Sequence, residues 1–107
     1  MTDLELTKLC AEASRIEVIL RLEGKLLTEF VLRDSTQTPY DPLRDDAQAM
    51  ALVKKFHIDC EWTSDTWIST CDVAPLGKAN TYGAPCGVSP DLNRAIVECC
   101  AKLQAAA

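Results

Sequence analysis

This sequence lacks the long apolar runs and the excess of basic residues that would point to a membrane or a nucleic acid. No apolar run reaches the roughly 18 residues of a membrane-spanning helix. The first residues include Asp3 and Glu5, where a signal peptide would be basic. The net charge is −5, whereas binding to phosphate backbones or anionic lipids requires clustered Lys and Arg. We therefore expect a cytoplasmic protein with no membrane or nucleic-acid partner.

Recognised catalytic motifs are also missing. The chain contains no Gly-rich phosphate-binding motif, no nucleophile elbow and no H-E-x-x-H sequence. Its single histidine, His57, is the one available base for a Ser-His or Cys-His mechanism. Because His57 follows a predicted helix, a role at the helix C-terminus explains it without catalysis. Asp59 lies two residues along the same predicted strand face and could orient His57.

The six cysteines show the spacing of neither a zinc site nor a secreted disulfide framework. Structural zinc sites use closely spaced cysteine pairs, whereas Cys60 and Cys71 are eleven residues apart and Cys99 is adjacent to Cys100. We expect reduced thiols, no metal and no cofactor. Four cysteines are predicted on core faces: Cys10, Cys60, Cys71 and Cys99. Cys100 and Cys86 are predicted to be accessible, and Cys86 is a candidate reactive thiol because it closely precedes the third predicted helix.

Apolar periodicity in the first half predicts a helix, two strands and a second helix. Helical spacing covers residues 2–14, where Thr2 and Glu5 match a capping box. Alternation from residue 16 predicts a strand, and a second strand follows over 26–32. The buried face of the first strand should consist of Ile16, Val18, Leu20 and Leu22. Residues 33–42 are predicted as a loop, and the second helix should begin near Pro42, with Asp41 or Leu43 at its cap position.

The second half predicts a hairpin, a long loop and a third helix. Strands near residues 57–62 and 67–73 should place Trp62 opposite Trp67, Cys60 opposite Ser69 and Ile58 opposite Cys71, all on the core side. The other side is polar and carries Asp59, Glu61 and Asp72. Residues 74–89 are rich in Pro and Gly and are predicted as an irregular loop. The third helix should begin at the Ser-Pro-Asp run of residues 89–91.

The resulting order, α-β-β-α-β-β-α, predicts one α+β domain over residues 1–107. The expected architecture is one antiparallel four-stranded sheet packed by three helices.

One segment pattern resembles a known family. It comprises the run Tyr40-x-Pro42-x-x-Asp45-x-x-x-Ala49, a strand ending at Trp62, a strand from Trp67 and a closing Pro-initiated helix. Over residues 16–103 this pattern resembles the phage α-β-α sandwich proteins, small phage and prophage proteins similar to the phage NinX-like group. The resemblance implies an α/β/α-type sandwich and a phage or prophage origin inside a bacterial host cell. It implies no catalytic residues.

Together these features favour a non-catalytic accessory protein that binds a host or phage protein, with interference in host defence as one form of that role. The acidic strand face and two loop tyrosines, aromatic anchors of the kind found at binding hot spots, are the candidate binding residues: Asp59, Glu61, Asp72, Tyr40 and Tyr82. Association of identical chains stays open. The alternative is a small enzyme or a ligand-binding or redox protein that uses His57, Asp59 or Cys86 beneath the 74–89 loop.

Overall fold

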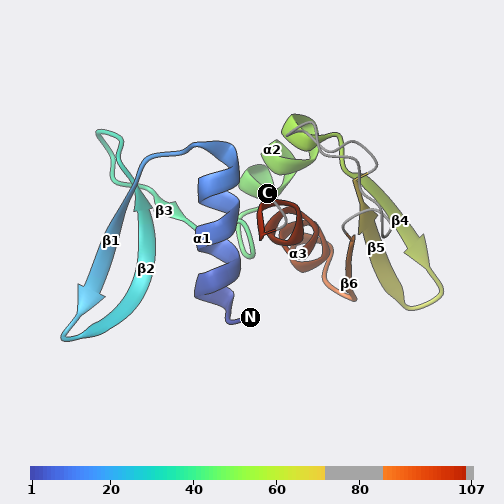
Figure 1. Ribbon diagram of the computed structural model, residues 1–107, viewed down its shortest axis with the longest axis horizontal. Coiled ribbons are helices and arrows are strands. Elements are labelled where there is room, and N and C mark those ends of the chain that lie inside the picture. The colour runs from blue at the N-terminus through green and yellow to red at the C-terminus, as the bar shows by residue number, and fades with distance from the viewer. Residues whose placement is uncertain (72–85, 106–107) are drawn as a thin grey trace.

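The computed structural model describes residues 1–71 and 86–105, which form three helices between two small sheets (Figure 1). The elements follow in the order α1 (Asp3–Ser14), β1 (Val18–Glu23), β2 (Leu26–Leu32), β3 (Pro39–Tyr40), α2 (Asp46–Phe56), β4 (Asp59–Thr63), β5 (Thr66–Thr70), β6 (Cys86–Ser89) and α3 (Leu92–Ala105). No helix among the described residues is long and apolar enough to cross a membrane.

The strands form two antiparallel sheets, so the prediction of a single four-stranded sheet is wrong. The first sheet has the order β1-β2-β3 and the second has the order β4-β5-β6. Each predicted hairpin acquires its own third strand, β3 from the predicted loop 33–42 and β6 from the predicted loop 74–89. In Figure 1 the helices lie between the two sheets, which also contradicts the α/β/α-type sandwich. The general α+β character of the chain is confirmed.

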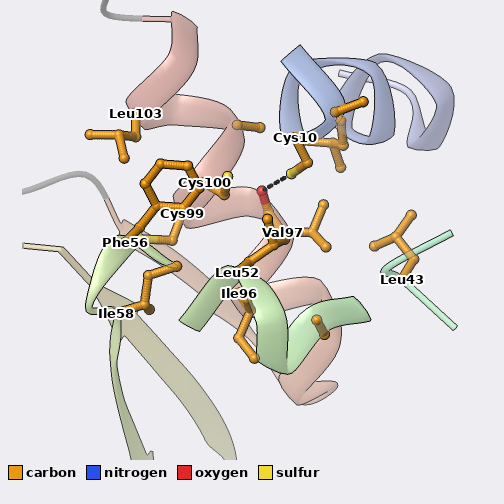
Figure 2. Close-up of a cluster of buried hydrophobic side chains, with 14 of the residues drawn as sticks. Cys10, Leu43, Leu52, Phe56, Ile58, Ile96, Val97, Cys99, Cys100 and Leu103 are labelled. Carbon is orange, nitrogen blue, oxygen red and sulfur yellow. Dashed lines mark hydrogen bonds between the residues drawn. The ribbon is translucent and has the colours of Figure 1, made fainter. Parts of the chain in front are cut away.

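Helix α3 forms the centre of the core and is buried over most of its surface instead of along one narrow stripe. One side of the helix reaches solvent, where Lys102 is exposed and Arg94 and Glu98 are partly exposed. Its buried residues are Ala95, Ile96, Val97, Cys99, Cys100, Ala101 and Leu103. On one side α1 contacts it, and the Cys10 Sγ donates a hydrogen bond to the Val97 carbonyl at 3.4 Å (Figure 2). On another side β6 approaches so closely that a Cβ added to Gly87 would lie 1.9 Å from the carbonyl oxygen of Ala95.

Local hydrogen bonds explain where the helices begin and end. The Thr2–Glu5 capping box of α1 is confirmed. Helix α2 begins later than predicted, with the Asp45 carboxylate accepting a hydrogen bond from the Gln48 N–H at 3.0 Å. The residues after Asp41 form a separate turn, closed by a 2.9 Å hydrogen bond from the Asp45 N–H to the Asp41 carbonyl, and this turn delays the helix.

The predicted buried face of the first hairpin is largely exposed. Side chains of Leu20 and Leu22 are 55% and 59% exposed, and Ile16 is also exposed. Phe30, which pairs with Leu20 across the hairpin, is buried in the core. Figure 1 shows why: the hairpin extends away from α1, so the helix covers only part of the sheet face. The alternation of apolar residues predicted the strand correctly, but it does not show how much of the strand is covered by a helix.

Candidate functional site

The β4–β5 hairpin has the predicted register. Trp62 lies opposite Trp67 and Cys60 lies opposite Ser69, so this prediction is confirmed. Thr63 pairs with Thr66 across a two-residue turn, and the Thr63 hydroxyl donates a hydrogen bond to the Thr66 carbonyl at 3.1 Å. This register sends alternate side chains of β4 to opposite faces of the second sheet.

The inner face of the second sheet packs on α3 through small residues. Ser69, Gly87 and Ser89 are buried there. Helix α3 packs mainly on β6 and β5, which leaves β4 one strand further from the core. Trp62 is therefore 52% exposed, although its ring still contacts that of Trp67 with centroids 5.3 Å apart. The prediction that Trp62 belongs to the core is wrong. Burial on this face depends on contact with α3, and α3 does not extend over β4.

The outer face of the second sheet faces solvent and has an acidic margin. One row across its three strands contains Asp59, Thr70 and Cys86, and the next row contains Glu61, Ile68 and Val88. Both carboxylates are exposed, and Val88 is 53% exposed. Within residues 1–71 and 86–105, neither carboxylate forms an ion pair. This face thus presents negative charge on β4 beside a small apolar patch on β5 and β6.

Strand β4 also has a free backbone edge. It pairs with β5 on one side, and no described strand pairs with its other side. The two-residue turn requires Thr63 and Thr66 to form a hydrogen-bonded pair, so Glu61 and Asp59 also direct their backbone groups toward β5. The backbone groups of Cys60 and Trp62 therefore point outward. An exposed edge of this kind is a template for an added strand.

The candidate catalytic residues do not converge. His57 ends α2 in a left-handed conformation and is exposed, and no hydrogen bond or ion pair joins it to Asp59. Asp59 and Cys86 share a row, but β5 lies between them. Two strand spacings separate their backbones by about 10 Å, which is too far for a hydrogen bond between these short side chains.

The cysteines divide into a buried group and an accessible pair. Cys10, Cys71, Cys99 and Cys100 are buried, whereas Cys60 is exposed and Cys86 is half-buried. The predictions for Cys60 and Cys100 are thus wrong: β4 extends beyond α3, and α1 covers the side of α3 that carries Cys100.

The chemistry of the buried thiols is that of packing groups. A hydrogen bond with Cys100 and burial raise the pKa of Cys10, and burial raises the pKa of Cys99 to about 12. None of the six cysteines, all of which are described, forms a disulfide. The described residues include no cluster of three or more metal-ligating side chains.

Tyr40 is not an accessible binding residue, so that prediction is wrong. It pairs with Phe30 across β2 and β3, which turns its ring into the core, and burial raises the pKa of its hydroxyl. The two-residue strand β3 is too short to show alternation in the sequence. Asp72, Tyr82 and most of the predicted 74–89 loop lie outside the described residues.

Comparison with known proteins adds no relative from which a role could be transferred. No family model matches the chain, and no curated protein or solved structure shows significant similarity to it.

Proposed function

We propose that this protein is a non-catalytic binding module that holds another protein along the free edge of β4. The observation that carries the proposal is the combination on one exposed strand of outward backbone groups, a half-exposed tryptophan and two carboxylates that have no cationic partner among the described residues. These groups belong to Cys60, Trp62, Asp59 and Glu61.

The expected partner is an extended segment that adds a strand to the second sheet. Main-chain hydrogen bonds supply affinity in this mode of recognition, and alternate side chains supply specificity. On the outer face, the segment would place Lys or Arg beside Asp59 and Glu61. On the inner face, it would place apolar side chains beside Trp62, a residue type enriched at binding hot spots. The favoured partner is therefore a segment that alternates basic and apolar residues.

The proposed setting is the one that the sequence resemblance implies. There the partner is a host or phage protein in the cytoplasm of a bacterial cell, and its capture could interfere with a host defence. The alternative, chemistry through His57, Asp59 or Cys86, has less support because these side chains do not meet.

Selection from a library of displayed random peptides tests the proposal. With the wild-type protein as bait, we expect enrichment of peptides that alternate basic and apolar residues. A folded Asp59→Lys/Glu61→Lys variant should lose that enrichment, because the carboxylates that choose the basic positions are reversed. Glu12→Lys on α1 is the matched control, and it should retain the enrichment, as should His57→Ala. Enrichment that survives the β4 reversal, or is lost in His57→Ala, would contradict the proposal.

A further inference from the structure

A second free edge lies at the opposite end of the molecule, on β1. This strand has β2 on one side, and no described strand on the other. The Arg33 N–H donates a hydrogen bond to the Glu17 carbonyl at 3.1 Å, which shows that the backbone of Glu17 faces β2. By alternation, Ile19 and Arg21 also face β2, and the even-numbered residues direct their backbone groups outward. The strand contains no proline, so all of its outward N–H groups can donate.

The same strand carries the largest group of exposed apolar side chains in the described chain. On the face that carries Phe30, Leu20 is 55% exposed and Leu22 is 59% exposed. On the opposite face, Ile19 is 37% exposed, and Leu26 of β2, opposite Glu23 at the hairpin end, is 75% exposed. Leu20 lies on the same face of the sheet as its cross-strand partner Phe30, which belongs to the core. An apolar sheet face that extends from the core to an edge that no described element covers is typical of an interface.

The order of charged residues along β1 indicates that the partner at this edge is a second copy of the chain. Consider an antiparallel pair of β1 strands related by a two-fold axis at Ile19. Glu17 then lies opposite Arg21 of the partner subunit, and the symmetry repeats this attraction once. Apolar side chains meet on the other face, where Val18 lies opposite Leu20 of the partner subunit. This register requires the even-numbered residues of each strand to form the backbone hydrogen bonds between the two copies. These are the residues whose backbone groups point away from β2.

Neighbouring registers are less favourable, because they place like charges opposite each other. An axis at Leu20 places Glu17 opposite Glu23 of the partner subunit, and an axis at Arg21 places two arginines opposite each other. Like charges directly opposite each other are destabilising. The favoured register also extends existing pairs: Arg21 forms a 2.8 Å ion pair with Glu29, and Glu17 is beside Arg33 in the ladder. The result is an alternating row of four charges, in the order Glu29, Arg21, Glu17 of the partner subunit and Arg33 of the partner subunit.

We propose that two copies of this chain associate through β1, antiparallel about a two-fold axis at Ile19, and join their first sheets into one continuous six-stranded sheet. Leu20 and Leu22 of both copies then share one apolar face. This interface uses the opposite end of the molecule from β4, so it goes beyond the proposed partner binding and stands or falls separately.

Sedimentation equilibrium of the full chain with charge-swapped variants tests the dimer. The wild-type protein should show twice the monomer mass of 11.7 kDa. Arg21→Glu and Glu17→Arg should each weaken association at least about tenfold, because each turns two attractive pairs into repulsive ones. An equimolar mixture of the two variants should restore association, since both cross-strand pairs then have opposite signs. Asp59→Lys/Glu61→Lys is the control and should remain dimeric.

Circular dichroism establishes that each variant is folded, and the mixture provides an internal check because misfolded chains would not regain association. A wild-type protein that stays monomeric up to about 1 mM, where binding is worth only about 4 kcal/mol, would overturn the proposal. Variants that dimerise like the wild type would overturn it too, as would a mixture that stays monomeric.

Discussion

Replacing Gly87 with alanine would force a methyl group into the contact between β6 and α3. The new Cβ would lie 1.9 Å from the Ala95 carbonyl oxygen and 2.9 Å from the Cys99 backbone nitrogen. Ordinary van der Waals contact begins near 3.4 Å. The obstacle is helix backbone, which cannot rotate away as a flexible side chain would.

The cost of this substitution follows from the movement it requires. Strand β6 and α3 must separate by about 1.5 Å to relieve the closest contact, and this separation loosens the packing of the second sheet on the core. Overpacking a core with one or two methyl groups costs about 1–3 kcal/mol when side chains can adjust, so a clash with backbone should cost about 3 kcal/mol or more. That loss is a large share of the roughly 5–15 kcal/mol expected for a domain.

Urea unfolding followed by tryptophan fluorescence and far-ultraviolet circular dichroism measures the effect. Gly24→Ala is the matched control, because Gly24 has a φ of +63° but no atom within 4 Å of an added Cβ. Its cost should reflect only the left-handed backbone, about 1 kcal/mol. If Gly87→Ala lowers the free energy of unfolding no more than Gly24→Ala does, the close contact between β6 and α3 is wrong.

Two further predictions concern the cysteines. In native protein, Ellman's reagent should react quickly with the accessible pair, Cys60 and Cys86, and after denaturation without reductant it should detect all six thiols. More than two fast thiols would contradict the burial pattern, and a total of four or fewer would contradict the reduced state. The free energy of unfolding should fall as the pH rises above about 8.5, because the unfolded chain loses thiol protons there, whereas burial raises the pKa of Cys99 to about 12 in the folded chain. Below pH about 8.5 the Cys99 thiol keeps its proton in both the folded and the unfolded chain, so the raised pKa takes nothing from the stability there. An unfolding midpoint that is unchanged from pH about 7 to about 10.5 would contradict the prediction.

Local features of this fold could be predicted from the sequence, whereas the layers could not. The α1 capping box depends on residues three apart, and the register of the β4–β5 hairpin is fixed by a short turn. The separation into two sheets depends on β3 and β6, which are two and four residues long and show too little alternation to recognise. The exposure of Leu20 and Trp62 depends on how far a helix extends over each sheet, which periodicity does not encode.

The candidate site shows the same division. Alternation placed Asp59 and Glu61 on an exposed face, and the structure agrees. Because a surface helix has one apolar stripe, the sequence predicts different environments for Cys99 and Cys100. Since α3 is surrounded by α1, α2 and the second sheet, both are buried. The free edge of β4, which carries the proposed function, could be recognised only after the sheet order was known.

Amide exchange across β4 tests binding through its free edge most directly. Backbone N–H groups of Cys60 and Trp62 point away from β5, whereas those of Asp59 and Glu61 are directed toward it. Nuclear magnetic resonance of the labelled protein, with a saturating amount of a selected peptide, should therefore show exchange slowed about tenfold or more at Cys60 and Trp62, and little further change at Asp59 and Glu61. Unchanged exchange at Cys60 and Trp62 while the peptide is bound would contradict the account.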